Sequence, residues 1–335
     1  MRILVAPDKF KGTASAHIVA ESISQALSSN HDILLQPLAD GGEGTVAAFG
    51  GSNRVDIVAG PLNTPVEAHW RLHGDTAVIE MAQASGLTLA GGIEGNDPIA
   101  ATTFGTGQLI GIAIERGARK ILVGAGGSAT TDGGLGALKA LHPLQRLREV
   151  SITVACDVRT HFVEAAETFG PQKGATPSQV QFLKRRLERV AQMYIEDRAV
   201  DVLNMKMAGA AGGLAGGLAS VGASLVQGFD AVSDAVELLD LIESVDLVIT
   251  GEGHVDESSF AGKVVGGVLA LAQETATPAI VITGSWEKSI SCPAPIYGLE
   301  EEVGREAAFS DTEKSIQQVV QKAISNFGKR SNIET

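Results

Sequence analysis

Several residue types are scarce in this 335-residue sequence, and each scarcity excludes a class of protein. There are two cysteines, Cys156 and Cys292, which form neither a CxxC pair nor a zinc spacing, so we expect no disulfide framework and no zinc site. Aromatic residues make up only 4% of the chain, so the core must consist mainly of alanine, valine, isoleucine and leucine. No charged segment precedes a long apolar run at the start, and we expect no signal peptide.

Basic residues are also few, with 26 lysines and arginines against 39 aspartates and glutamates. The net charge of −13 predicts that neither nucleic acid nor an anionic membrane is the main partner, although a small anion can still be held by local lysines. The uncharged stretch 207–229 is long enough to span a bilayer, but its glycine, alanine and serine make it too weakly apolar. These features favour a soluble, cytoplasmic protein.

Two common nucleotide-binding motifs are missing. There is no GxxxxGKS/T sequence, which excludes a P-loop enzyme, and the GEG at 251–253 lacks the third glycine of a GxGxxG fingerprint. GxSxG and HExxH are absent as well. Any nucleotide must therefore be bound by a different arrangement of loops.

Glycine, in contrast, is abundant. Its 40 copies cluster at the ends of apolar runs, as is typical of α/β folds that carry ligand loops there. The densest cluster, GAGGSATTDGG at 124–134, follows the apolar run at 121–123. Its backbone N–H groups and hydroxyls suit phosphate oxygens, and its carboxylate suits Mg²⁺ or a proton to be removed. A tight strand-to-helix turn with a purely structural role is the alternative.

Strands and helices are expected to alternate at both ends of the chain, whereas the middle differs. Buried strands are predicted at 3–6, 33–35, 247–250 and 279–284. A helix is expected to start near Thr13 or Ser15. Short strands at 54–59, 66–72 and 76–81 predict an antiparallel or mixed sheet. We therefore expect an α/β protein with a Rossmann- or flavodoxin-like parallel-sheet domain from residues 1–44 and 241–335, and an inserted mixed α/β domain at 45–240.

Two further segments have local signatures. Thr176-Pro177-Ser178-Gln179 predicts a helix start, because it combines a capping box with proline at the first helical position. The glycine- and alanine-rich segment at 209–213 is read as a close packing contact or a phosphate cradle, and packing is favoured for most of its glycines.

Four loops share one pattern, in which an apolar strand is followed by glycine, a carboxylate and often a hydroxyl or a lysine. This mixture suits phosphoryl transfer, because Mg²⁺ needs carboxylates, the phosphate needs lysine and backbone N–H groups, and the acceptor hydroxyl needs a base. We expect the loops to converge on a cleft between the two domains. They contain Asp8, Lys9 and Lys11; Asp40, Glu43 and Thr45; Ser128, Thr130, Thr131 and Asp132; and Glu252 and Asp256, with Lys173 and Lys263 nearby.

Six segments carry a resemblance to a known family. They are APDKFKG (6–12), LADGGEGT (38–45), GAGGSATTDGG (124–134), FGPQKGA (169–175), GAAGGL (209–214) and DLVITGEGHVDESSFAGK (246–263). In this order, over most of the chain, they resemble the motifs of the glycerate kinase type-1 family. The resemblance implies ATP-dependent phosphorylation of D-glycerate to 2-phosphoglycerate or 3-phosphoglycerate, with Mg²⁺ (magnesium) as cofactor. It leaves open whether the protein forms a homo-oligomer.

The resemblance also suggests roles for the loop residues. Asp40 and Asp132 are candidate bases or Mg²⁺ ligands, with Asp256 as a further metal ligand. Lys9 and Lys11 are expected to hold the glycerate carboxylate or the transferred phosphate. The residues expected to bind the nucleotide are Gly126, Gly127, Ser128, Thr130, Thr131, Glu252 and Lys263.

The chain departs from the family pattern at three places. The segment 135–151 is shorter than usual, and His254 stands where the family usually has arginine. Arg159-Thr160-His161-Phe162 replaces the usual Asn-Pro-Leu turn after Asp157. These departures keep two alternatives open: a catalytically silent protein that binds a nucleotide or small acid, and a kinase of a related small hydroxy acid.

Overall fold

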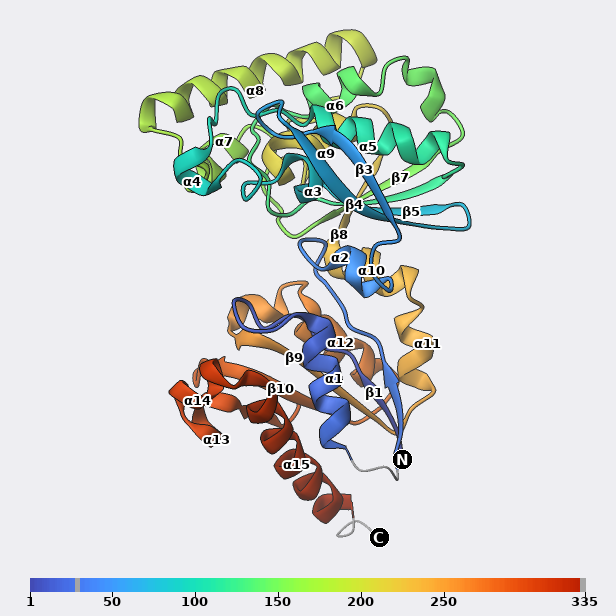
Figure 1. The fold of residues 1–335 in the computed structure, drawn as a ribbon, viewed down its shortest axis with the longest axis vertical. Coiled ribbons are helices and arrows are strands. Elements are labelled where there is room, and N and C mark those ends of the chain that lie inside the picture. The colour runs from blue at the N-terminus through green and yellow to red at the C-terminus, as the bar shows by residue number, and fades with distance from the viewer. Residues whose placement is uncertain (28–30, 332–335) are drawn as a thin grey trace. The chain divides into compact units, whose positions relative to one another are not determined.

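The computed structural model describes residues 1–27 and 31–331, which form two compact units. Unit 1 contains the described residues of 1–40 and 232–335, and unit 2 contains residues 41–231. The blue-to-red colouring of Figure 1 shows that unit 1 is built from both ends of the chain. The expected cleft between two domains stays a prediction.

Unit 1 is organised around a five-stranded sheet in the order β11-β10-β9-β1-β2, and every neighbouring pair is parallel. Its strands are β1 (Arg2–Val5), β2 (Asp32–Leu35), β9 (Leu247–Val255), β10 (Ala279–Trp286) and β11 (Ile296–Gly298). Its helices are α1 (Ala16–Ala26), α11 (Leu238–Glu243), the 3₁₀ turn η4 (Glu257–Phe260), α12 (Val264–Glu274), α13 (Leu299–Val303), α14 (Arg305–Ser310) and α15 (Thr312–Ser331).

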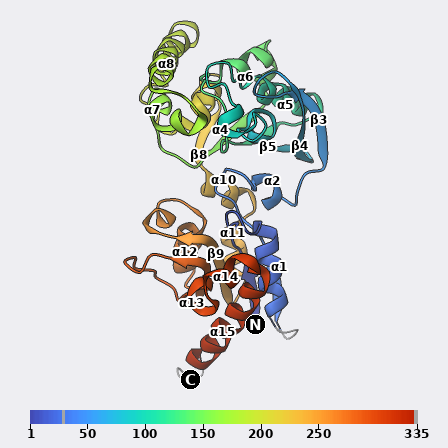
Figure 2. The same ribbon diagram turned by 60° about the vertical axis from the view of Figure 1, so that its left-hand side comes forward.

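Both faces of this sheet are covered by helices. Successive strand residues point to opposite faces. Ile3 and Val5 pack with α1 and α15, which lie side by side in Figures 1 and 2. Val281 packs with Val265 and Leu269 of α12 in a separate cluster. A parallel sheet with two covered faces is the doubly wound arrangement expected from the sequence, so this part of the fold class is confirmed.

Unit 2 contains a six-stranded mixed sheet in the order β3-β4-β5-β6-β7-β8. The pairs β3–β4 and β4–β5 are antiparallel and the remaining pairs are parallel, which confirms the mixed sheet expected for the middle of the chain. Its strands are β3 (Arg54–Ala59), β4 (Pro65–His73), β5 (Thr76–Glu80), β6 (Lys120–Gly124), β7 (Ser151–Cys156) and β8 (Ser224–Gln227). Its helices are α2 (Thr45–Ala48), α3 (Ala82–Ser85), α4 (Gly92–Gly95), α5 (Phe104–Glu115), α6 (Leu135–Ala140), η1 (Leu144–Leu147), α7 (Ala165–Phe169), η2 (Pro171–Lys173), α8 (Pro177–Arg198), η3 (Ala210–Gly213) and α9 (Leu214–Ala219), with α10 (Gly228–Ala235) crossing into unit 1.

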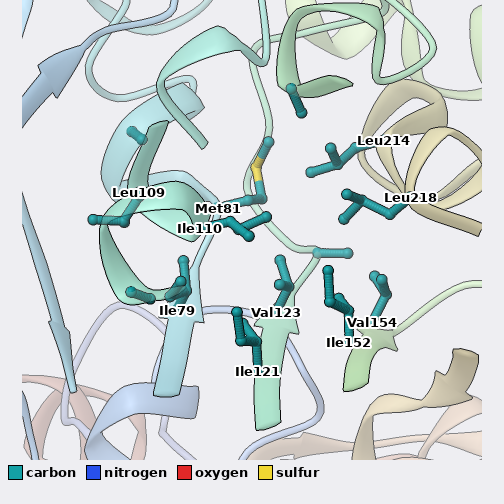
Figure 3. Packing of buried hydrophobic residues seen from close by; sticks show 14 of the residues in the cluster. Ile79, Met81, Leu109, Ile110, Ile121, Val123, Ile152, Val154, Leu214 and Leu218 are labelled. Carbon is teal, nitrogen blue, oxygen red and sulfur yellow. The ribbon is translucent and has the colours of Figure 1, made fainter. Parts of the chain in front are cut away.

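The core of unit 2 fixes the strand from which the glycine-rich loop emerges. Figure 3 shows Ile121 and Val123 of β6 among buried side chains of β5, β7, α5 and α9. On the opposite face, Leu122 packs with Val46 of α2 and Ala231 of α10. Because β6 is packed on both faces, the loop at its carboxyl end starts from a firmly held position.

Two helix starts confirm local predictions. Ser15, one of the two expected caps, accepts a hydrogen bond from the backbone N–H of Ile18 at the start of α1. At the start of α8, Thr176 and Gln179 form the reciprocal capping box. Within residues 1–27 and 31–331, no helix has the length and apolar character needed to cross a membrane.

Candidate active site

Three carboxylates gather at the carboxyl ends of the neighbouring strands β9, β1 and β2 of unit 1. Asp8 follows β1, Asp40 follows β2, and Glu252 lies in β9. The backbone links these segments, since the N–H of Asp8 donates to the carbonyl of Gly251 and the N–H of Leu38 donates to the carbonyl of Pro7. In an open parallel sheet this edge is where ligands bind.

Asp8 is a strongly perturbed carboxylate of this group. Burial raises its pKa to about 7, the nearby Lys9 ammonium lowers it, and the negative charges of Asp40 and Glu252 raise it further. The Asp8 carboxylate also accepts a hydrogen bond of 2.7 Å from the Lys9 backbone N–H. A carboxyl group with a pKa near neutrality is suited to proton transfer. The sequence placed Asp8 in a candidate loop, but its burial is visible only in the structure.

Glu252 is buried with one oxygen unsatisfied. Its Oε1 has no hydrogen-bond partner, and burial is the main cause that raises the pKa of this carboxyl group, partly opposed by the Ser259 hydroxyl and by Lys263. Lys263 itself donates a 2.8 Å hydrogen bond to the Ser258 hydroxyl. A buried carboxylate oxygen without a partner is costly, so Glu252 is a candidate ligand for a cation or a donor group.

Asp256 forms hydrogen bonds with residues that follow it closely in the chain. Its carboxylate accepts hydrogen bonds from the Ser258 hydroxyl at 2.6 Å and from the Ser259 N–H at 3.2 Å, which caps η4. The hydrogen bond from Ser258 is the main cause that lowers the pKa of Asp256. Its expected role as a metal ligand stays a prediction.

The predicted metal ligands belong to different units, since Asp40 and Asp256 lie in unit 1 and Asp132 lies in unit 2. Among the described residues, no three histidine, cysteine, aspartate or glutamate side chains form a ready-made metal cluster. Mg²⁺ is commonly held by one or two carboxylates, with water and substrate phosphates as the other ligands. The unsatisfied Glu252 oxygen and the nearby Asp40 fit this kind of incomplete site.

Lys9 and Lys11 lie on the loop that follows β1. Gly253 of β9 lets this loop pass close by, because a Cβ at that position would lie 3.0 Å from the backbone nitrogen of Lys11. Lys9 is half-buried and Lys11 is exposed. The loop that contains these two lysines therefore begins at the edge of the sheet where the carboxylates gather.

In unit 2, the glycine-rich loop connects β6 to α6 and contacts two other glycine segments. A Cβ on Gly126 would lie 2.6 Å from the Cα of Gly42, so the loop touches the 41–45 segment backbone to backbone. A Cβ on Gly212 would lie 1.9 Å from the carbonyl oxygen of Thr130, and Gly212 accepts a hydrogen bond from the Gly133 N–H. Close approach explains these glycines, and the packing interpretation of the 209–213 segment is confirmed.

Glu80, which no motif in the sequence marks, holds the segment that follows Asp40. Its buried carboxylate accepts hydrogen bonds from the N–H groups of Gly44 and Val46, at 3.0 and 2.8 Å, at the start of α2. In sequence it looks like the polar end of an ordinary strand. Only the pairing of β5 with its neighbours reveals that it faces the start of a helix.

The carboxylate of Asp132 accepts several hydrogen bonds from the protein. Its two oxygens accept hydrogen bonds from the N–H and hydroxyl of Thr103, and from the N–H groups of Gly134 and Gly136, at 2.9–3.2 Å. These donors belong to the starts of α5 and α6, which the carboxylate ties together. A base or ligand role for Asp132 would compete with these bonds, and it stays a prediction.

The hydroxyls of the loop differ in accessibility. Ser128 lines a pocket of about 300 Å³, whereas Thr130 and Thr131 are fully buried. Thr130 donates to the carbonyl of Ala211 at 3.4 Å, and the Thr131 hydroxyl has no hydrogen-bond partner. The structure therefore brings Gly126, Gly127 and Ser128 together at one pocket.

Lys173 lies beneath this loop. Only 3% of Lys173 is exposed, and its Nζ donates 2.7 Å hydrogen bonds to the Ser128 hydroxyl and the Thr130 carbonyl. Burial lowers the pKa of Lys173 to about 7, against the opposing charge of Asp132. It lines the same 300 Å³ pocket, whose apolar walls include Leu87 and Phe169.

The segment that departs from the family pattern is packed into unit 2. The carbonyl of Thr160 accepts a hydrogen bond from the Gly209 N–H. The buried Phe162 ring meets Tyr194 edge to face, with ring centroids 6.2 Å apart. Asp157 and Val158, just before this segment, line the Lys173 pocket. The substitution thus has a structural role beside the pocket.

Comparison with known proteins identifies the family to which these loops belong. The sequence matches the glycerate kinase family over residues 3–144 and 142–329, which together span nearly all of the chain. The protein belongs to the glycerate kinase family. Members of this family are ATP-dependent kinases, so the chain is a small-molecule kinase that transfers a phosphoryl group to an alcohol.

Individual relatives agree with the family. The chain is 38% identical to a glycerate 2-kinase of Escherichia coli, with 92% of this chain and 90% of the relative covered. It is 38% identical to a glycerate kinase of Bacillus subtilis, with 85% of each chain covered. The crystal structure of a proposed glycerate kinase 2 from Salmonella typhimurium LT2 superposes with a TM-score of 0.85 at 35% identity, covering 99% of both chains. The α/β fold class is confirmed by this likeness.

Proposed function

We propose that this protein transfers the γ-phosphate of ATP to a hydroxyl of D-glycerate and releases 2-phosphoglycerate and ADP. Family membership and the names of the relatives support this substrate. The observation that carries the proposal is the grouping of Asp8, Asp40 and Glu252 with Lys9 and Lys11 at one edge of the unit 1 sheet. Acidic oxygens and ammonium groups together suit a small hydroxy acid and a phosphate.

In this proposal Asp40 accepts the proton of the attacking hydroxyl. It is half-buried, and so more accessible than Asp8, which is 6% exposed. Lys9 and Lys11 bind the glycerate carboxylate or the transferred phosphate. Asp132 shapes the glycine-rich loop, because its oxygens already accept hydrogen bonds from the starts of α5 and α6.

Mg²⁺ would be held by Asp40 and Glu252, with Asp256 as a further candidate. When bound, the ion would offset the negative charge of the phosphates. The nucleotide phosphates are assigned to the pocket lined by Gly126, Gly127 and Ser128. Thr130 and Thr131 support the loop from within, and the expected nucleotide contacts of Glu252 and Lys263 stay predictions.

Phosphorus NMR of the product made from D-glycerate, ATP and MgCl₂ tests the proposal. We expect the resonance of 2-phosphoglycerate to grow together with that of ADP, and neither to grow with the Asp40→Asn variant. A 3-phosphoglycerate signal would correct the position of transfer. ATP binding without ADP release would support the silent binding protein, and turnover of only another hydroxy acid in a substrate panel would overturn D-glycerate as substrate.

A further inference from the structure

Lys173 is a buried cation without a counter-ion. It is 3% exposed, and both of its hydrogen-bond acceptors, the Ser128 hydroxyl and the Thr130 carbonyl, are uncharged. No carboxylate within residues 1–27 and 31–331 forms an ion pair with it. Asp132, which acts on it at longer range, is held by the starts of two helices. Burying a charge in this way is costly unless an anion joins it.

The backbone beside Lys173 offers further donors. Within the described residues, the N–H groups of Gly126, Gly127 and Ser128 donate no hydrogen bond, although the neighbouring Ala125 and Ala129 donate to Ala155 and Ser85. Successive N–H groups form an anion-binding concavity where the backbone turns through a left-handed residue, and Gly127 has a φ of 70°. Lysine has three N–H donors, and its two protein acceptors leave one for a ligand.

We propose that Lys173, with the N–H groups of residues 126–128, binds a phosphate group of the nucleotide in the 300 Å³ pocket of unit 2. The apolar walls at Leu87 and Phe169 suit the uncharged part of the same molecule. Asp157, which is exposed and also lines the pocket, opposes a second anionic group there. The inference rests on the proposed kinase function, to which it adds a residue and a location for the nucleotide.

Isothermal titration calorimetry with ADP, adenosine, inorganic phosphate and D-glycerate separates the sources of an anionic group. The variant is Lys173→Met, which removes the charge and keeps much of the length. Its control is Lys120→Met, an exposed lysine at the opposite end of β6 from the glycine-rich loop. We expect Lys173→Met to weaken ADP binding roughly 10- to 100-fold, the loss of one charge-assisted hydrogen bond, with adenosine binding unchanged. Lys120→Met should leave all ligands unaffected.

Other outcomes overturn the proposal. An unchanged ADP affinity in folded Lys173→Met shows that Lys173 only supports the loop, and an equal loss for ADP and adenosine shows the same. Weaker binding of D-glycerate alone would place the substrate carboxylate in the pocket. A response to inorganic phosphate without one to ADP would make it a free-phosphate site. None of these measurements requires turnover, so a failed D-glycerate reaction leaves the test of the pocket intact.

A wild-type measurement covers the case in which the variant does not fold. At pH 8, without divalent cations, ADP binding is titrated in two buffers of different ionisation enthalpy. A phosphate placed against Lys173 raises the pKa of its ammonium, with Asp132 and Asp157 as the other charged groups that face it, so binding takes up a proton from the buffer. Binding without proton uptake contradicts the proposal.

Discussion

Each of the two units buries an ionisable group near the carboxyl end of a parallel strand, and the two groups have opposite charge. In unit 1 the group is Asp8, which lies just after β1. In unit 2 it is Lys173, which contacts the loop that follows β6. In unit 1, burial raises the pKa of Asp8 to about 7, and in unit 2, burial lowers the pKa of Lys173 to about 7. Low polarity disfavours whichever form is charged, so an acid and a base are shifted in opposite directions. The shared architecture thus places an acidic edge in one unit and a cationic pocket in the other.

The carboxylates of the two units differ in how well they are satisfied. In unit 2, Glu80 and Asp132 accept hydrogen bonds from backbone N–H groups at helix starts. In unit 1, the Glu252 Oε1 has no hydrogen-bond partner, and the negative charges of Asp40 and Glu252 raise the pKa of Asp8. The comparison teaches that the hydrogen-bond partners of an aspartate or glutamate, more than its motif, distinguish a structural from a chemical role.

The sharpest test of the comparison is the pair Asp40→Asn and Asp132→Asn. We expect Asp40→Asn to lower kcat about 10²- to 10⁴-fold, as for loss of a general base, with little change in thermal stability. Asp132→Asn should lower thermal stability more than Asp40→Asn does. Coupled ADP-release assays and thermal unfolding check both. Full turnover in both variants would exclude a catalytic role for either aspartate.

A second test removes the Asp132 carboxylate altogether. Asp132→Ala leaves donors at the starts of α5 and α6 without an acceptor, and we expect the free energy of unfolding to fall by about 2–4 kcal/mol. Denaturant titration measures this change, with Glu149→Ala at an exposed position as control. A stable Asp132→Ala protein that has lost all turnover would instead support the catalytic role.

The third test concerns pH in unit 2. Because the pKa of Lys173 is about 7 in the folded protein and 10.5 as its ordinary value, the unfolded chain binds more protons between these values. Stability should therefore rise as pH increases from 7 to 10, at up to about 1.4 kcal/mol per pH unit. Denaturant titrations at several pH values check this, and the rise should be absent from Lys173→Met. An unchanged slope in that variant would contradict the assignment.

The smallest effect is expected in unit 1, where Lys9 partly offsets the burial of Asp8. The pKa of Asp8 is about 7 in the folded protein against an ordinary value of 3.8, so the folded state binds more protons between them. The contribution of Asp8 to stability is present below pH 4 and is lost as pH rises to 7. Denaturant titrations in EDTA at several pH values give the free energy of unfolding of wild type and of Asp8→Asn. Its slope against pH should differ between the two proteins over this range. Parallel curves would show that Asp8 is not buried as described.

Much of the fold was predictable because its signals are local. Three kinds of local feature depend only on neighbouring residues: the short apolar strands, the Ser15 helix cap and the Thr176–Gln179 capping box. Each is present in the structure. The glycine-rich loop was also located correctly after β6. Its glycines were harder to interpret, because a phosphate cradle and a backbone contact both require the same residue.

The sequence by itself determined the family, the α/β class, most of the buried strands and the loops that carry polar residues, since these follow from spacing and residue type. Only the tertiary structure decided that Asp132 is saturated with hydrogen bonds, that Glu252 has an unsatisfied oxygen and that Lys173 is buried beside three unused N–H groups. Asp132 depends in part on Thr103, 29 residues away, and Lys173 depends on Ser128, 45 residues away. Desolvation and hydrogen bonding are set by what surrounds a group in space, and no short stretch of sequence contains that information.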